Sequence, residues 1–168
     1  KQLALGQSAS ASRAIWNAAR AAARMTSETG IYMRALSLLD IALWDLNGQL
    51  TATPLWRALG GAQQSVHCLA ICGYYRPGAD WKAESLAVIR AEGERLRAAG
   101  YARFKIPFGE DIDLDIQRIR ELRSVIGADA MLGLDASGMF NSIKDVLAAW
   151  RRIENLGVDF LEDPFPAD

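Results

Sequence analysis

The alternation of strands and helices is clearest in residues 101–140, which read YARFKIPFGE DIDLDIQRIR ELRSVIGADA MLGLDASGMF. Two short apolar runs, at 102–108 and 130–135, flank a stretch with helical periodicity at 112–125. The run at 130–135 does not alternate with polar residues, which is typical of parallel strands that are covered on both faces, whereas the run at 102–108 contains Arg103 and Lys105. The stretch therefore predicts a strand, a helix and a second, parallel strand of an α/β fold.

The same pattern continues before and after this stretch. It predicts two more strands and two more helices, at residues 66–72, 158–162, 83–99 and 142–155. A regular repeat of this length fits a (β/α) barrel of the TIM type or a doubly wound open sheet. A complete barrel takes about 250 residues, so the sequence predicts part of a TIM-type barrel with about four strands.

Residues 1–62 differ from this repeat because they are rich in alanine and other helix formers. Three helices are expected, at residues 8–25, 32–47 and 54–59, and Asn47 with Gly48 is expected to end the second one. Four leucines of that helix recur at the spacing of a buried stripe, namely Leu36, Leu39, Leu43 and Leu46. The sequence thus predicts a helical segment over 1–62 and a strand and helix repeat over 63–168.

Composition and charge exclude two classes of partner. The 168 residues are 51% hydrophobic and 23% charged, and 19 basic against 20 acidic residues leave a net charge of −1. A nucleic-acid-binding domain would show a basic stripe, and a membrane span would need roughly 18 consecutive apolar residues; the sequence contains neither. We therefore expect a cytoplasmic protein with no nucleic-acid or membrane partner. Cys68 and Cys72 would lie about 13 Å apart in an extended strand, too far for a disulfide.

Three successive predicted strands end in an ionisable residue followed by a turn, at Lys105, Asp135 and Glu162. In parallel α/β folds the carboxyl ends of the strands open onto the active site. Two carboxylates on adjacent strands, about 5 Å apart, repel each other unless a cation lies between them. A hard divalent ion, most naturally Mg²⁺, would remove that conflict. The alternative is a structural network in which the carboxylates cap helices and Lys105 neutralises them.

Several motifs resemble one family of enzymes. Residues 35–48 (ALSLLDIALWDLNG) and 54–61 (PLWRALGG) resemble the helical signature that precedes the barrel in the mandelate racemase and muconate lactonizing enzyme family of the enolase superfamily. The strand around Lys105 resembles the Lys-x-Lys strand of that family. Residues 134–138 (LDASG) and 160–164 (FLEDP) resemble its next two strand ends. The resemblance extends over most of the chain.

The resemblance implies an α+β capping domain on an eight-stranded barrel. Residues 1–62 would link the capping domain to the barrel, and 63–168 would be the N-terminal half of the barrel in a protein more than twice as long. It also implies Mg²⁺ held by three carboxylates on successive strands; Asp135 and Glu162 match the first two, and the third would lie beyond the last residue given. Members abstract the proton α to a carboxylate and stabilise the resulting enediolate on the metal. Lys105 matches a catalytic lysine that assists electrostatically.

Two positions depart from the family pattern. Pro107 stands where many members have a second lysine that acts as the base, so this strand cannot supply that base. Ser137 stands where the family usually has asparagine. Members without the second lysine rely on a His–Asp pair from later strands, and dehydration of a sugar acid suits that arrangement.

The resemblance therefore predicts a Mg²⁺-dependent lyase, an acid-sugar dehydratase, which acts on a small carboxylate or sugar-acid substrate and is a homo-oligomer when full length. A racemase, epimerase or cycloisomerase of the same family is the isomerase alternative. Two further alternatives are a Schiff-base aldolase with Lys105 as the nucleophile and a catalytically degenerate homologue.

Two other features have functional and structural interpretations. His67, at the start of the first predicted strand, is interpreted as a packed or solvated histidine because it lies at the end away from the active face. The loop after that strand lies on the active-site side and contains residues that either contact substrate or pack, namely Tyr74, Tyr75, Arg76 and Trp81.

Overall fold

The computed structural model describes residues 4–24, 29–62, 65–75, 78 and 80–166. The chain divides into two compact units, Lys1–Val66 and His67–Asp168. Within the described residues, the first unit is helical and the second contains a sheet with its connecting helices.

The first unit consists of η1 (Ala9–Ala11), α1 (Ser12–Ala23), α2 (Gly30–Leu50) and α3 (Leu55–Ala58). Two side chains of α2 hydrogen-bond to the earlier elements. The Tyr32 hydroxyl donates to the Ala19 carbonyl at 2.7 Å, and the Asn47 side-chain amide donates to the Ala9 carbonyl at 2.6 Å. These contacts join both ends of α2 to the elements before it.

The expected end of the second helix at Asn47 and Gly48 is wrong, because α2 continues to Leu50. Asn47 is engaged with η1 through its side chain, and its backbone keeps the helical conformation. The helix ends one turn later, where the Thr51 hydroxyl donates to the Asn47 carbonyl at 2.7 Å. Ala52 then takes a φ of +50°, in the left-handed region, and the chain reverses.

The leucine stripe of α2 is confirmed at its N-terminal end and wrong at its C-terminal end. Leu36 is buried, Leu39 and Leu43 are half-buried, and Leu46 is exposed. Near this end of α2, the side chain that contacts η1 is that of Asn47, and the neighbouring Leu46 is 43% exposed.

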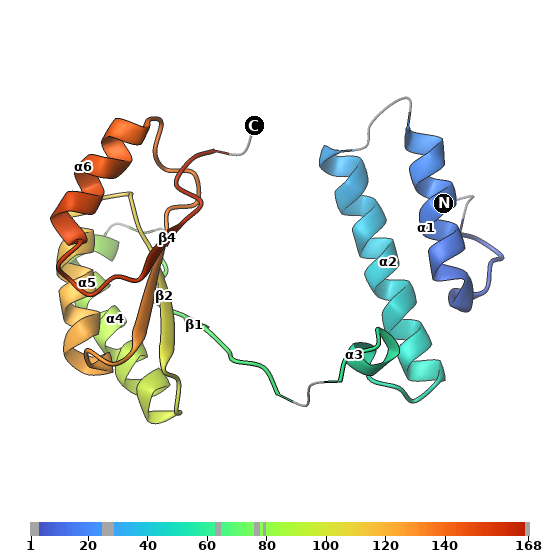
Figure 1. Ribbon diagram of the computed structural model, residues 1–168, viewed down its shortest axis with the longest axis horizontal. Coiled ribbons are helices and arrows are strands. Elements are labelled where there is room, and N and C mark those ends of the chain that lie inside the picture. Colours follow the sequence, from blue (N-terminus) through green and yellow to red (C-terminus); the bar gives the residue numbers. More distant parts are fainter. Residues whose placement is uncertain (1–3, 25–28, 63–64, 76–77, 79, 167–168) are drawn as a thin grey trace. The chain divides into compact units, whose positions relative to one another are not determined.

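The second unit is a parallel sheet with helices between its strands. Its strands are β1 (Ala70–Ile71), β2 (Arg103–Pro107), β3 (Met131–Asp135) and β4 (Phe160–Glu162), in the spatial order β1-β2-β3-β4. Its helices are α4 (Trp81–Ala98), α5 (Ile112–Ile126) and α6 (Ile143–Ile153). The three helices cover one face of the sheet (Figure 1). The predicted parallel α/β repeat is confirmed.

All four predicted strands are shorter in the structure, and the first and last of them have specific contacts at their ends. Of the run 66–72, only Ala70 and Ile71 pair with β2, because β2 begins just one residue before the partner of Ala70. β4 begins at Phe160 because the carboxylate of the preceding Asp159 accepts a hydrogen bond from the backbone of β3 at 2.7 Å. The Asp159 N–H still donates to the Leu132 carbonyl at 2.8 Å, so the Asp159 side chain replaces only the backbone acceptor that the predicted strand pairing would supply there.

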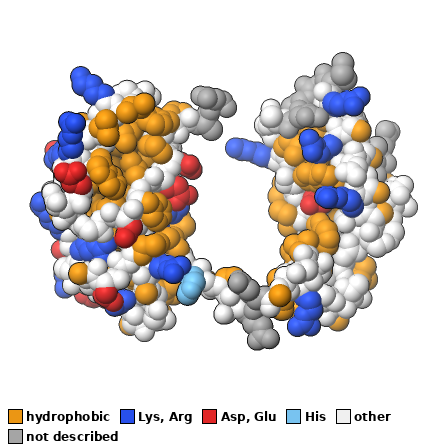
Figure 2. Space-filling model, in the orientation of Figure 1, with side chains coloured by type: hydrophobic (Ala, Val, Ile, Leu, Met, Phe, Trp, Pro, Cys, Tyr) orange, Lys and Arg blue, Asp and Glu red, His pale blue; other side chains and the backbone are white. Residues whose placement is uncertain are grey.

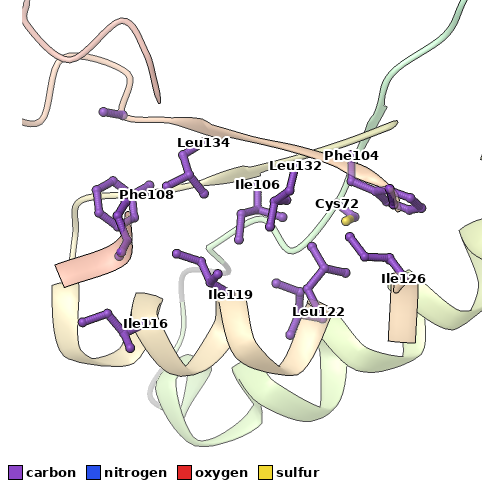
Figure 3. Close-up of a cluster of buried hydrophobic side chains, with 14 of the residues drawn as sticks. Cys72, Phe104, Ile106, Phe108, Ile116, Ile119, Leu122, Ile126, Leu132 and Leu134 are labelled. Atoms are coloured by element: carbon purple, nitrogen blue, oxygen red, sulfur yellow. The ribbon is translucent and has the colours of Figure 1, made fainter. Parts of the chain in front are cut away.

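Alternate residues of the strands point toward the helices and form the core. Phe104 and Ile106 of β2, with Leu132 and Leu134 of β3, are fully buried. Figure 3 shows these side chains directed at α5, where they meet buried residues of its inner face, namely Ile116, Ile119, Leu122 and Ile126. Burying each such side chain contributes about 1.5–3 kcal/mol, so this layer holds the strands in place for the opposite face.

The residues between them point to the other face of the sheet, which would be the barrel interior. In one row the register aligns Lys105, Gly133 and Phe160, and in the next Pro107, Asp135 and Glu162. The Phe160 ring lies over Gly133, where an added Cβ would be only 2.1 Å from a ring carbon. Glycine is therefore required at position 133 for this ring to cross the adjacent strand.

The surface carries both charged and hydrophobic side chains. Figure 2 shows acidic and basic side chains interspersed with hydrophobic ones on the visible face of each unit. Among the described helices, none combines the length and hydropathy that a membrane span requires. Cys68 is exposed and Cys72 is buried, and no disulfide joins them, as expected.

Candidate functional site

The candidate site lies at the carboxyl ends of β2, β3 and β4. Asp135 and Glu162 are register partners on adjacent strands, so their side chains emerge on the same face. Lys105 lies one row deeper on β2, and its ammonium reaches up between them. Its Nζ is 2.9 Å from Asp135 Oδ2 and 2.8 Å from Glu162 Oε2. The structure therefore brings the three predicted site residues together.

Ser137 fixes the orientation of the Asp135 carboxylate. Asp135 Oδ1 accepts hydrogen bonds from the Ser137 backbone N–H at 3.0 Å and from the Ser137 hydroxyl at 2.8 Å. Ser137 adopts a φ of +44°, in the left-handed region, which folds the turn back onto the carboxylate. The serine thus holds one oxygen of Asp135 while the other faces Lys105.

The charges of the cluster stabilise each other. Partial burial alone would raise the pKa of Asp135, but hydrogen bonds from Lys105 and Ser137 outweigh it and lower that pKa. Hydrogen bonds to Glu162 and Asp135 raise the pKa of Lys105 against the opposing effect of burial. Lys105 is therefore a protonated cation at neutral pH, and the three groups together carry one net negative charge.

The two carboxylates fit part of a magnesium site. Carboxylate oxygens are the ligands that Mg²⁺ prefers, and the ion usually keeps several waters. The side chains of Asp135 and Glu162 are 25% and 41% exposed, which leaves room for such waters. Within the described part of the chain, no group of three or more His, Cys, Asp and Glu residues is arranged to hold a metal. Two carboxylates of the kind that Mg²⁺ prefers thus face the same cation, the Lys105 ammonium.

A cavity of about 190 Å³ adjoins the cluster. Asp135 and Ser137 form its polar side, and Pro107 lies on its wall. The remaining lining residues are mostly apolar or aromatic: Ile71, Tyr74, Tyr75, Phe108, Ala136 and Met139. The cavity therefore places a space of small-molecule size next to the Asp135 carboxylate, with Pro107 on the wall where a second lysine would project.

Sequence reasoning missed a buried ion pair behind this cavity. Asp115 and Arg118, three residues apart on α5, are both fully buried, and Arg118 Nη1 donates to Asp115 Oδ1 at 2.7 Å. The Tyr75 hydroxyl also donates to Asp115, at 2.8 Å. The available signal was a pair of charged residues on the apolar face of an amphipathic helix, where charges are rarely buried unless they are paired.

The other residues singled out from the sequence lie outside the cluster. His67 is exposed and precedes β1, at the amino end of the sheet. Arg76 falls outside the described residues. Trp81 is the first residue of α4, and its ring contacts that of Tyr75 edge-on, with the ring centroids 5.1 Å apart.

Comparison with known proteins gives the family. Residues 88–168 match the family model for the enolase C-terminal domain-like fold. Arabinonate dehydratase of Saccharolobus solfataricus is 29% identical over 155 residues, which is 92% of this chain and 40% of the dehydratase. L-Ala-D/L-Glu epimerase of Clostridium acetobutylicum is 32% identical over 135 residues, 79% of this chain and 35% of the epimerase.

The solved structures agree with the sequence relatives. A racemase from Streptomyces coelicolor, whose crystal structure contains bound magnesium, superposes with a TM-score of 0.80 at 27% identity, over 98% of this chain and 44% of the racemase. The parallel sheet, its covering helices and the polar strand ends define part of a TIM-type barrel. Residues 88–168 therefore belong to the enolase C-terminal domain-like family, and the relatives that align with most of the chain include a dehydratase, an epimerase and a racemase. The chain spans about two-fifths of the length of the curated relatives it matches.

The predicted family and fold class are thereby confirmed. The roles of Lys105 as a catalytic residue and of Asp135 and Glu162 as metal ligands stay predictions, as does the assignment of residues 1–62 and 63–168 to the capping linker and the half-barrel.

Proposed function

We propose that this chain supplies half of the active site of a Mg²⁺-dependent acid-sugar dehydratase, which removes the proton α to a carboxylate. The observation that carries the proposal is the cluster in which Lys105 Nζ lies within 2.9 Å of carboxylates from two successive strands. A site of this kind holds fixed charges where negative charge develops on the substrate. We also propose a cytoplasmic location and a homo-oligomeric state for the full-length protein.

Each residue of the cluster has a distinct proposed role. Asp135 and Glu162 would hold the metal, which when bound stabilises negative charge on the substrate's carboxylate oxygens. Ser137 keeps one Asp135 oxygen oriented. Lys105 stays protonated and presents a positive charge beside the same oxygens. A third carboxylate and a His–Asp pair would come from strands that follow β4.

Pro107 supports dehydration over racemisation. A racemase must deliver and remove protons on both faces of the α-carbon, so it needs an acid–base group on each side. Pro107 cannot transfer a proton, and it lies in the row of Asp135 and Glu162, where a lysine would face the substrate. Arabinonate dehydratase and D-galactarolactone cycloisomerase are among the sequence relatives. The second candidate is therefore a cycloisomerase, which also needs a single base.

The geometry does not favour the aldolase alternative. A Schiff-base lysine attacks a carbonyl as the neutral amine, so its pKa is normally lowered by a desolvated or cationic environment. Lys105 instead contacts two carboxylates, and these hydrogen bonds raise its pKa. It is therefore suited to act as a fixed cation.

Incubation of the full-length protein with Mg²⁺ and a panel of aldonic and aldaric acids is expected to yield a 2-keto-3-deoxy acid from at least one of them. Semicarbazide derivatisation detects such a product by its absorbance. Exchange of the α-proton with solvent deuterium and no keto product would indicate a racemase instead. Absence of both reactions would contradict the proposed function.

Replacement Asp135→Asn is expected to weaken Mg²⁺ binding by more than about tenfold, because removal of even a metal ligand's supporting partner typically weakens binding 10–100-fold. Titration calorimetry of the full-length protein with Mg²⁺ measures the effect. Asp129→Asn is the matched control, since Asp129 precedes the opposite end of β3 and pairs with Arg97 on the surface. Equal Mg²⁺ affinity in the two variants would refute the assignment and would support a degenerate site.

A further inference from the structure

The segment that leaves β1 is held on both sides of Tyr74. The Gly73 backbone N–H donates to Glu92 Oε2 at 2.6 Å, and the Gly73 carbonyl accepts a hydrogen bond from the Arg118 guanidinium. On the other side, the Tyr75 hydroxyl donates to both carboxylate oxygens of Asp115, each at 2.8 Å. The backbone on either side of Tyr74 is therefore fixed by contacts to α4 and α5.

The Tyr75 ring is held as firmly as its hydroxyl. The Arg118 guanidinium carbon lies 4.5 Å from the ring centroid, a cation–π distance. Burial and the neighbouring Asp115 raise the pKa of Tyr75, so its hydroxyl stays protonated and keeps donating. Tyr75 is therefore an anchor whose polar atom is already engaged.

The same ion pair also holds the wall formed by β2. The Gly109 N–H donates to Asp115 Oδ2 at 2.8 Å, and Arg118 Nη1 lies 3.2 Å from the Pro107 carbonyl oxygen. Asp115 and Arg118 thus connect the end of β1 to the end of β2. A buried ion pair is weak evidence for stability, because desolvation opposes the attraction of the charges. The contacts of the Asp115–Arg118 pair hold the segment after β1 and the end of β2, which form two walls of the same cavity. This positioning is a role for the pair that does not depend on its contribution to stability.

Tyr74 differs from both of its fixed neighbours. It is 62% exposed, and it lines the cavity together with Asp135 and Ser137. Its ring offers an apolar face, and its hydroxyl both donates and accepts hydrogen bonds. Such a side chain suits a substrate whose carbon chain carries hydroxyl groups, because the ring covers carbon atoms while the phenol bonds to oxygen.

We propose that Tyr74 contacts the substrate and sets specificity for a hydroxylated acid, and that the buried Asp115–Arg118 pair positions it through Gly73 and Tyr75. This inference rests on the proposed function. Tyr74 is the specificity-determining residue, and Tyr75, Asp115 and Arg118 are positioning residues without direct contact to the reacting atoms.

The first test uses Tyr74→Phe in the full-length protein, with the acid sugar that the wild type dehydrates. KM is expected to rise about 3- to 10-fold with kcat within twofold, since one hydrogen bond to bound substrate is lost. Tyr101→Phe is the matched control, because Tyr101 lies at the amino end of β2. An unchanged KM in Tyr74→Phe would overturn the role of Tyr74 while the proposed function stands. Absence of turnover by the wild type would overturn both.

The second test addresses positioning with Tyr75→Phe, which removes one hydroxyl and leaves the Asp115–Arg118 bond in place. KM is expected to rise in this variant too, and Mg²⁺ affinity is expected to match the wild type. In the double variant the effect of Tyr74→Phe on KM is expected to shrink, because a displaced Tyr74 has already lost its contact. Strict additivity of the two effects would show that Tyr75 does not act through Tyr74.

Discussion

Replacement of Lys105 by methionine in the full-length protein is expected to lower kcat/KM by about 10²–10⁴-fold, the range for a positioned electrostatic or acid–base group. The side chain of Lys105 is only 10% exposed, and its ammonium is the one cation placed by the described residues between Asp135 and Glu162. Methionine fills a similar volume but carries no charge, so the decrease in kcat/KM measures the contribution of the ammonium group. Steady-state kinetics with the preferred acid sugar measures it.

The Mg²⁺ affinity of the Lys105→Met variant distinguishes a loss of catalysis from a disrupted site. Mg²⁺ affinity is expected to stay equal or to rise slightly in Lys105→Met, because a positive charge beside the two carboxylates is removed. Lys144→Met serves as the control, since Lys144 is exposed on α6. Unchanged turnover in Lys105→Met would identify Lys105 as a structural ion-pair residue.

Replacement of Asp115 by alanine is expected to lower the free energy of unfolding by about 3–5 kcal/mol, the range for a broken buried pair. The change leaves the fully buried Arg118 guanidinium without its carboxylate, and it removes the acceptor of the Tyr75 hydroxyl and the Gly109 N–H. Urea unfolding of the full-length protein, followed by circular dichroism, measures the loss.

Asp113→Ala provides the comparison for this prediction. Asp113 lies on the same helix, its side chain is 81% exposed, and it pairs with Arg152 at the surface. Exposed pairs of this kind contribute about 0–1 kcal/mol. Similar losses in the two variants would show that burial of the Asp115–Arg118 pair has no special energetic consequence.

The strand ends could be predicted from the sequence because two local signals coincide there. Short apolar stretches mark the strands, and Asp135 and Glu162 directly follow the stretches 130–134 and 160–161. The topology of a parallel sheet then brings these ends together, and the observed contacts with Lys105 follow from the register.

Two features that were not predicted, the end of α2 and the buried ion pair, involve contacts between residues far apart in the sequence. α2 extends past Gly48, and its Asn47 side chain hydrogen-bonds to the Ala9 carbonyl 38 residues earlier, a contact that no local pattern encodes. The ion pair of Asp115 and Arg118 has its partners at Gly73 and Tyr75, some forty residues earlier in the chain. The position of Asp115 and Arg118 on the apolar face of α5 could indicate a buried pair, but their partners at Gly73 and Tyr75 could not be predicted from the local sequence.

The absence of a side chain at Gly133 affects what happens when β4 separates from β3. The interior surface of β3 at this position has no side chain of its own and is covered by the Phe160 ring of β4. Detachment of β4 therefore exposes the middle of β3 to water at the same time as it separates Glu162 from Lys105. Local unfolding of β4 and loss of the charge cluster are therefore coupled, so the integrity of the cluster reports on the cooperativity of β3 and β4.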